Sequence, residues 1–393
     1  MNGQGLEAWR LHGGASYKRP GACVKRLTAG SRAGTLDERM STFDPNAAAT
    51  PGSGVFGLPF EPEDAAVVLV PVPWEATTSY GGGTAGGPAA ILAASHQVDL
   101  FDLDAGRAYE RGIAMLAEDA QVSRWNREAR ALAQKVIAVG GEIDGKPALV
   151  KALARVNALS RSVNAWVERT TGAWLDRGKI VGVVGGDHSV PLGAIAAYGA
   201  RFPGLGVLHL DAHSDTRVAY EGFTYSHASI MERVLAEVPR VKRLVQVGIR
   251  DFCEAEHELT RKAGKRVAVW FDAELDRQRF TGRSWDDLAK RIVAGLPKDV
   301  YLSWDIDGLD PTLCPHTGTP VPGGLSFAEA VHLLRTLVAS GRRIVGFDLN
   351  EVAPGPDGDE WDANVGARLL YKMCLFTLIS QAGSSNRRRK VRR

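Results

Sequence analysis

Short apolar runs alternate with stretches of helical periodicity along most of this chain, from about residue 65 to residue 379. Seven runs have the length of buried strands and are predicted at residues 67–72, 180–184, 206–210, 243–248, 266–270, 300–304 and 344–347. Helical periodicity dominates the intervals, including most of residues 107–178. Apolar strands separated by helices indicate a parallel sheet covered on both faces. We therefore predict an α/β fold of three αβα layers, with a doubly wound parallel sheet of about eight strands.

The two ends of the chain lack this alternation. Residues 1–60 are rich in glycine and in basic residues or proline, which predicts a disordered or extended N-terminal arm. Residues 1–39 have the composition of a transit peptide or of an extension upstream of a start at Met40, and the sequence leaves both open. Six basic residues within 383–393 predict a disordered, solvated tail. Residues 61–382 are expected to form a single domain.

The composition favours a globular enzyme over a nucleic-acid or membrane protein. The chain has 393 residues, of which 45% are hydrophobic and 24% charged, and the basic tail accounts for its formal net charge of +3. No nucleic-acid motif accompanies the tail, and no apolar run reaches the roughly 18 residues of a membrane span. The cysteines lack paired spacing, which indicates a reducing, cytoplasmic location. We expect Cys314 to be a packing residue and not a nucleophile.

Three polar clusters each follow a predicted strand. They contain six side chains that can bind metal, namely His188, Asp211, His213, Asp215, Asp305 and Asp307. In an extended segment residues i and i+2 point to the same face, so Asp211 and His213 can converge, as can Asp305 and Asp307. Parallel sheets bind ligands beyond the carboxyl ends of their strands. Four carboxylates and two imidazoles exceed the needs of one ion and predict two ions that share bridging carboxylates.

A glycine-rich segment at residues 81–86 fits the pattern GxGxxG and suggests a nicotinamide site as an alternative. The preceding strand is predicted to end near Val72, and residues 74–80 separate it from the glycines. This separation prevents the tight strand-to-helix turn that a dinucleotide site needs. The pattern therefore favours an ordinary loop.

The stretches GGDHS, DAHSD, SWDIDGLDP and FDLNEVAP resemble, in the same order, the ureohydrolases of the arginase and agmatinase superfamily. The resemblance covers about residues 67–379, and its motifs are highly specific. It implies two divalent metal ions, one bound by His188, Asp211, Asp215 and Asp305, and the other by Asp211, His213, Asp305 and Asp307. It also implies a glycine-rich loop beside the substrate entrance and a homo-oligomer, either a trimer or a hexamer.

The same resemblance implies the residues that act on the substrate. Asp215 and His227 match the carboxylate and the proton-shuttling histidine that serve the attacking water and the leaving nitrogen. Glu351 matches the carboxylate that binds the guanidinium group through two parallel hydrogen bonds, and Thr319 matches a hydroxyl of the same pocket. Taken alone, His227 also fits a helix cap or surface position, and Glu351 fits a loop-bracing ion pair.

The substrate is predicted from residues 216–226, which differ from the arginase segment that holds the amino-acid end of arginine. Three aromatic residues in this segment are expected to fill the volume of a long substrate tail, and Tyr225 is expected to contact the substrate. Residues 73–80 and 359–364 also look more like the guanidine hydrolase branch. We therefore expect hydrolysis of free guanidine to urea and ammonia, with agmatine, arginine or another guanidino acid as the alternative. The guanidine branch implies nickel and the rest of the family manganese, and oxygen and imidazole ligands accept either ion.

Two other classes of protein would explain part of the pattern. A catalytically silent subunit would keep the fold, but it should have lost ligands, and all six are present here. A zinc amide hydrolase of the related deacetylase type would keep one metal site, whereas His188 and Asp307 complete a second. The number of ions bound per active chain separates these interpretations from a binuclear ureohydrolase.

Overall fold

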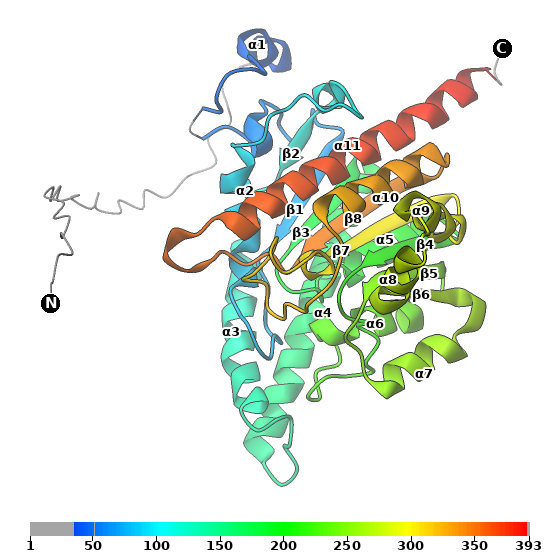
Figure 1. Cartoon of the computed structure of the whole chain (residues 1–393). Helices are drawn as coiled ribbons and strands as arrows, with labels where there is room; N and C mark the ends of the chain where they lie inside the picture. The colour runs from blue at the N-terminus through cyan, green and yellow to red at the C-terminus, as the bar shows by residue number, and fades with distance from the viewer. Residues whose placement is uncertain (1–34, 51, 391–393) are drawn as a thin grey trace, which may run out of the picture.

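The computed structural model describes residues 35–50 and 52–390, with only the backbone of residues 382–390. Eight strands form one sheet: β1 Val67–Val72, β2 Ile113–Met115, β3 Ile180–Gly185, β4 Leu205–Leu210, β5 Val241–Ile249, β6 Val267–Phe271, β7 Asp299–Asp305 and β8 Arg343–Asn350. Their order is β2-β1-β3-β8-β7-β4-β5-β6, and all neighbours are parallel (Figure 1). The predicted doubly wound parallel sheet is confirmed.

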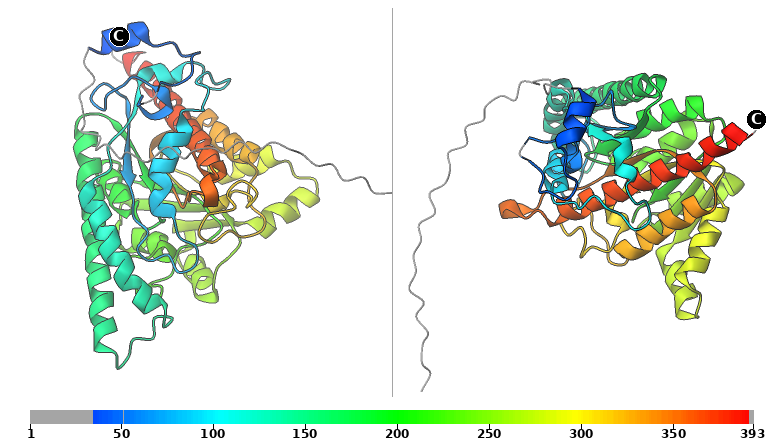
Figure 2. Two further views of the ribbon diagram at one scale, coloured as in Figure 1. Left: turned by 90° about the vertical axis from the view of Figure 1, so that its left-hand side faces the viewer. Right: turned by 90° about the horizontal axis from the view of Figure 1, so that it is seen from above.

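Helices on both faces complete three layers (Figure 2). One face packs against α2 Gly87–Ser95, α8 Asp272–Phe280, α9 Trp285–Ala294, α10 Phe327–Ala339 and α11 Trp361–Lys390. The other face packs against α3 Ala120–Ile137, α4 Pro147–Asp176, α5 Leu192–Arg201 and α6 Ile230–Glu237. Alternate residues of β3 enter opposite cores, with Val184 on the first face and Val183 on the second. Burial on both faces explains why the strands are continuous apolar runs.

The N-terminal arm is partly packed onto the domain. Residues 1–34 lie outside the described residues, but α1 Leu36–Thr42 follows them and Arg39 forms an ion pair with Asp64 at 2.7 Å. Phe56 and Leu58 are at most 2% exposed and belong to the core beside α2 and α11. Burying large apolar side chains stabilises the attachment by about 1.5–3 kcal/mol each. Residues 55–60 are therefore part of the folded body rather than of a free arm.

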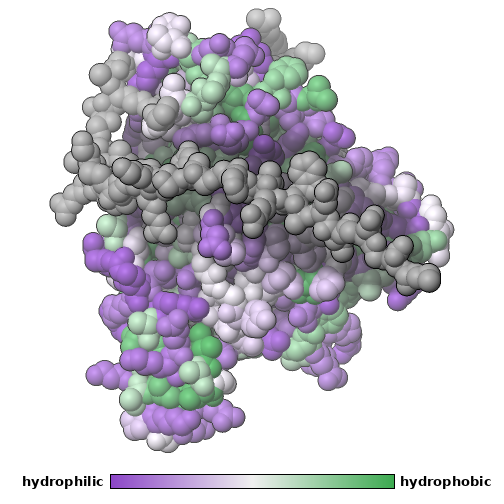
Figure 3. All heavy atoms as spheres, turned by 60° about the vertical axis from the view of Figure 1, so that its left-hand side comes forward, coloured by the Kyte–Doolittle hydropathy of each residue, from purple (hydrophilic) through white to green (hydrophobic). Residues whose placement is uncertain are grey.

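The antiparallel pair α3 and α4 projects beyond the rest of the domain (Figure 2). Figure 3 shows apolar side chains gathered near the far end of this pair, where Val150 is 49% exposed. Helix α11 continues to Lys390 at the other end of the chain. It therefore includes most of segment 383–393, for which we expected a disordered tail. Residues 391–393 lie outside the described residues. Within the described part of the chain, none of the helices is long and apolar enough to cross a bilayer.

Candidate binuclear metal site

Four neighbouring strands at the centre of the sheet bring the polar clusters to one place. The strands β3, β8, β7 and β4 lie side by side in that order. His188 follows β3, Asp211 follows β4, Asp305 ends β7 and Glu351 follows β8. The carboxyl ends of parallel strands meet at one edge of a sheet, so the topology alone gathers residues that are more than 160 positions apart in sequence.

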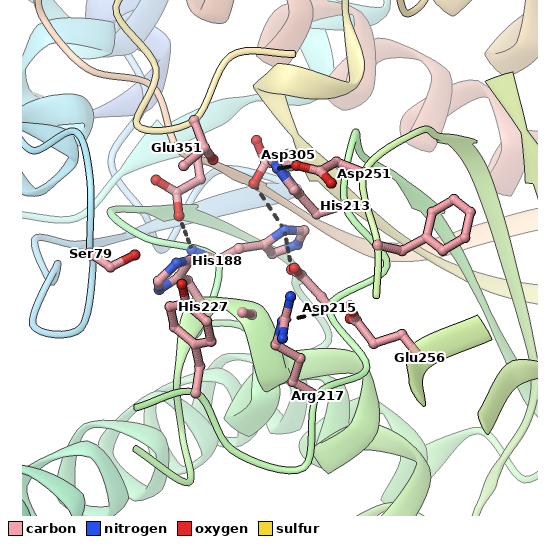
Figure 4. Close-up of a pocket in the computed structure, with 14 residues that line it drawn as sticks. Ser79, His188, His213, Asp215, Arg217, His227, Asp251, Glu256, Asp305 and Glu351 are labelled. Atoms are coloured by element: carbon pink, nitrogen blue, oxygen red, sulfur yellow. Dashed lines mark hydrogen bonds and ion pairs between the residues drawn. The ribbon is translucent and has the colours of Figure 1, made fainter. Parts of the chain in front are cut away.

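His188 lies at the centre of the first group of ligands (Figure 4). Its Nδ1 atom is 3.0 Å from Oδ2 of Asp211, 3.2 Å from Oδ2 of Asp305 and 3.6 Å from Oδ2 of Asp215. All four side chains are at most 5% exposed. The turn before His188 requires glycine, because a Cβ atom on Gly186 would lie 1.9 Å from the carbonyl oxygen of Trp74. Three carboxylates and one imidazole therefore face a common point.

A second group forms beside the first and shares Asp211 with it. The Nδ1 atom of His213 is 3.0 Å from Oδ2 of Asp307 and 3.5 Å from Oδ1 of Asp211. Asp211 thus turns one carboxylate oxygen toward each histidine, which is the position of a bridging ligand. Asp305 turns Oδ2 toward His188, while its Oδ1 accepts the backbone N–H of Asp307 at 2.9 Å. The structure brings all six predicted ligands together.

The charges in this cluster suit divalent cations. Burial raises the pKa values of Asp215 and Asp305 well above the usual range, and neighbouring carboxylates raise them further. For Asp211 burial acts in the same direction, but His209 and His188 outweigh it and hold the pKa well below its usual value. Closely spaced buried carboxylates repel one another as anions, and metal ions remove that cost. Oxygen and imidazole donors in this number fit two ions of manganese or nickel.

His209 belongs to the site, although the motifs did not point to it. It precedes Asp211 by two residues in β4, and its Nε2 atom is 2.8 Å from Oδ2 of Asp211. The amide nitrogen of Gln246 donates to the carbonyl of Ser214 at 2.7 Å and to Nδ1 of His209 at 3.0 Å. Nδ1 therefore accepts, and the ring proton sits on Nε2 and faces Asp211. The spacing of two residues along a strand was the available signal, because it places both side chains on one face.

Glu351 offers an unpaired carboxylate oxygen beside the ligands. Its Oε1 accepts the backbone N–H of His188 at 2.8 Å, whereas the buried Oε2 has no hydrogen-bond partner among the described residues. The backbone φ of +61° is left-handed, and the hydroxyl of Thr317 donates to the Glu351 carbonyl at 2.9 Å. Burial and the charge of Asp305 raise the pKa of the Glu351 side chain well above its usual value. Thr319 lines the same cavity.

His227 lines the cavity at the start of the short helix η4 His227–Ser229. Burial lowers its pKa to about 3, and the charge of His213 contributes, so the ring is neutral at neutral pH. Its Nδ1 atom is 3.3 Å from the hydroxyl of Ser226 and 3.4 Å from that of Thr77. Within the described chain nothing hydrogen-bonds to Nε2. A neutral imidazole with a free ring nitrogen at a cavity is suited to carry protons.

The aromatic segment occupies less of the cavity than the sequence suggested. The cavity has a volume of about 160 Å³, and Tyr220 and Arg217 line one wall. Phe223 is fully buried between α3 and α4, and Tyr225 packs against the core on the α4 and α6 face. Tyr225 is not among the residues that line the cavity, contrary to the sequence-based expectation. Its ring gains more by packing against apolar neighbours than by facing a polar site.

Two loops meet at the entrance. The backbone N–H of Gly81 donates to the carbonyl of Gly318 at 3.1 Å, and a Cβ atom on Gly81 would lie 2.5 Å from that oxygen. Oε2 of Glu75 accepts the N–H groups of Gly83 and Ala85 at 2.7 and 3.0 Å. The glycines therefore permit a close contact between loops and a carboxylate cap before α2. They do not form the strand-to-helix turn of a dinucleotide site.

Comparisons with known proteins agree with this geometry. The model of the arginase family matches residues 65–375. An N(1)-aminopropylagmatine ureohydrolase of Synechocystis sp. is 32% identical over 317 residues, which cover 79% of this chain and 88% of the relative. An agmatinase of Klebsiella pneumoniae is 32% identical over 320 residues, or 80% of this chain and 88% of the relative.

Solved structures give the same fold. The agmatine ureohydrolase of Thermoplasma volcanium aligns with a TM-score of 0.63 and 22% identity over 88% of this chain and 99% of that one. Proclavaminate amidino hydrolase from Streptomyces clavuligerus aligns with a TM-score of 0.64 and 24% identity over 85% of this chain and 99% of that one. The chain therefore belongs to the arginase family and is a ureohydrolase, a hydrolase of C–N bonds in amidino compounds.

Proposed function

We propose that this ureohydrolase binds two divalent metal ions and cleaves a guanidinium C–N bond of a small guanidino substrate to release urea. The observation that carries the proposal is the shared position of Asp211, whose two oxygens face His188 and His213 at 3.0 and 3.5 Å. Four carboxylates and two imidazoles provide enough ligands for two ions around that bridge. When bound, two such ions lower the pKa of water and so make it a nucleophile near neutral pH.

Glu351 orients the substrate in this proposal. A guanidinium group presents parallel N–H donors, and the free Oε2 of Glu351 is a buried acceptor beside the ligands. His188 fixes the other oxygen through its backbone N–H at 2.8 Å, so the carboxylate is held before the substrate arrives. Holding a planar cation with its central carbon toward the attacking water supplies the benefit of proximity. Thr319 adds a hydroxyl to the lining of the same cavity.

Asp215 and His227 handle the protons. The oxygen of water becomes the carbonyl oxygen of urea, the C–N bond breaks, and the leaving nitrogen must gain a proton. Asp215 lines the cavity among the metal ligands and can hold the proton that water loses. His227 is neutral and has a free Nε2 atom, so it can pass a proton to the departing nitrogen. The side chain is partly buried and lines the same cavity as Asp215.

Free guanidine is our first choice of substrate, with ammonia as the second product. The cavity of about 160 Å³ is small, and Tyr220 and Arg217 occupy the wall where a substrate tail would lie. Agmatine is the alternative, because relatives at 32% identity are named agmatinase and N(1)-aminopropylagmatine ureohydrolase. We assign nickel if guanidine is the substrate and manganese otherwise. The trimeric or hexameric assembly and the cytoplasmic location stay predictions.

Two measurements test the proposal. Metal content and urea release should be measured on protein loaded with manganese or with nickel, and we expect two ions per active chain. Fewer than two ions in fully active protein would overturn the binuclear mechanism. Urea release from guanidine, agmatine, arginine and guanidino acids should be compared at equal concentration. A strong preference for a long-tailed compound would overturn the choice of guanidine and leave the ureohydrolase activity in place.

A further inference from the structure

Arg217 places a positive charge on the cavity wall next to the candidate metal site (Figure 4). Its backbone N–H donates to the carbonyl of Ala228 at 3.1 Å, which fixes the residue beside η4. The guanidinium carbon lies 5.1 Å from the centroid of the Tyr220 ring, and this stacking limits the side chain to one side of the cavity. The side chain is 37% exposed, so its charge is only partly screened by solvent.

Glu256 pairs with Nε of the Arg217 guanidinium group and leaves its two terminal nitrogens unpaired. Its oxygens accept the backbone N–H groups of Thr216 and Cys253 at 3.0 and 2.9 Å, and the residue is 4% exposed. Nε of Arg217 lies 3.6 Å from Oε2 of this fixed carboxylate. The two terminal nitrogens of Arg217 have no hydrogen-bond partner among the described residues. The guanidinium fork is therefore anchored at Nε, with its terminal N–H groups available to the cavity.

Apart from Glu256, the charged side chains that line the cavity leave the terminal N–H groups of Arg217 unpaired. Asp215 and Asp305 are ligands of the candidate metal site, and Glu351 is assigned to the guanidinium group of the substrate. Asp251 lines the rim but its side chain is 67% exposed, so water screens it strongly. His227 is neutral at neutral pH. Glu256 is a buried carboxylate that also lines the cavity and offsets part of the Arg217 charge, but Nε of Arg217 and two backbone N–H groups already occupy its oxygens. A second positive charge on the substrate would therefore meet the terminal N–H donors of Arg217 rather than a free carboxylate oxygen.

Building on the proposed function, we infer that Arg217 determines substrate specificity by excluding guanidino compounds with a cationic tail. Compounds without a tail avoid the repulsion, and a carboxylate tail can pair with the free edge of the guanidinium group. The substrate class is thus free guanidine and short guanidino acids, whereas agmatine and its aminopropyl derivative are disfavoured. Glu256 and solvent reduce the repulsion that a cationic tail meets at Arg217, and we expect the remaining effect to lower kcat/KM by roughly tenfold.

The test compares two substrates of similar length and opposite charge, agmatine and 4-guanidinobutyrate, with guanidine as the reference. In the wild-type protein we expect higher kcat/KM for 4-guanidinobutyrate than for agmatine. Arg217→Met should raise kcat/KM for agmatine relative to guanidine by roughly tenfold, and Arg217→Lys should retain the discrimination because the charge remains. Arg279→Met is the matched control, since Arg279 is 38% exposed and ion-paired but lies on α8 and does not line the cavity.

The outcomes separate the two proposals. The role of Arg217 is overturned if agmatine is the preferred substrate of the wild type. It is also overturned if Arg217→Met and Arg217→Gln both leave the ratio of kcat/KM for agmatine to kcat/KM for guanidine within twofold of the wild type. In both cases the ureohydrolase assignment stands. Two neutral variants are used so that poor folding of one does not decide the result, and thermal unfolding identifies such a variant. No urea from any guanidino compound with metal-loaded wild type would overturn the proposed function itself.

Discussion

Replacing Glu351 with glutamine separates the cost of a buried charge from its catalytic benefit. Glutamine keeps the shape of the side chain and can still accept the backbone N–H of His188, which Oε1 of Glu351 accepts at 2.8 Å. It cannot offer two oxygens to a guanidinium group, because its amide nitrogen is a donor facing donors. The change therefore removes the interaction assigned to Oε2 with little change in volume.

The expected loss of activity is large. Removing one partner of a buried, charged, two-point interaction costs about 3–4 kcal/mol. At about 1.36 kcal/mol for each factor of ten, kcat/KM should fall by roughly 10²- to 10³-fold. The free energy of unfolding of the metal-free protein should change in the opposite direction. The pKa of Glu351 is raised in the folded state, so its ionisation opposes folding above its unfolded pKa, and glutamine removes that cost.

The assays are urea release with saturating metal and thermal unfolding in the presence of a chelator. At pH 7 we expect a higher Tm for the metal-free Glu351→Gln protein than for wild type, and the difference should shrink as the pH falls toward the unfolded pKa of glutamate. Asp357→Asn is the control, because Asp357 also has a positive φ, of 54°, but is exposed. Unchanged kcat/KM in Glu351→Gln would refute the assignment of this carboxylate to the guanidinium group.

Three further predictions concern the histidines and the metal ligands. The pKa of His227 is about 3 in the folded protein, so keeping the ring neutral costs free energy of unfolding once the pH falls below the pKa of histidine in the unfolded chain. His227→Asn should therefore reduce the loss of stability in acid by about 1–2 kcal/mol at pH 4.5, after allowance for solvent screening. Urea unfolding at pH 7 and at pH 4.5 measures this difference. His209→Leu should lower metal affinity by about 10- to 100-fold in a competition titration. His209→Gln should recover part of that affinity, because its amide can still donate to Asp211. Equal affinities in the two variants would contradict the role of His209 in orienting Asp211. Asp307→Asn should leave one ion per chain by elemental analysis, and retention of two would show that the second group of ligands is misassigned.

The strands and the ligand positions could be predicted from the sequence because they depend on local rules. Strands buried on both faces read as continuous apolar runs, and each polar cluster comes directly after such a run. The topology rule then places the ends of β3, β4, β7 and β8 at one edge without any knowledge of side-chain contacts. The family motifs added the roles of individual residues, which spacing alone does not supply.

Features that depend on packing were harder to predict. The three-residue strand β2 is too short to stand out from its surroundings, and it forms because β1 offers a free edge. Tyr220, Phe223 and Tyr225 are aromatic residues of one loop, and the sequence does not distinguish them. Only Tyr220 lines the cavity, because the loop packs Phe223 and Tyr225 against apolar residues of the neighbouring helices. The sequence does not single out His209, because a histidine inside an apolar run is typical of a core residue. Its role becomes clear only from the structure, in which the Gln246 amide contacts its ring.

Two acidic residues of the candidate site have a left-handed backbone, which sets backbone stability against activity at these positions. Asp215 and Glu351 have φ values of 54° and 61°, a conformation that glycine adopts freely and that costs other residues on the order of 1 kcal/mol. Glycine at either position would relieve this backbone strain, but it would also remove a carboxylate that the proposed reaction uses. For the metal-free chain, backbone stability and activity therefore favour different residues at these two positions.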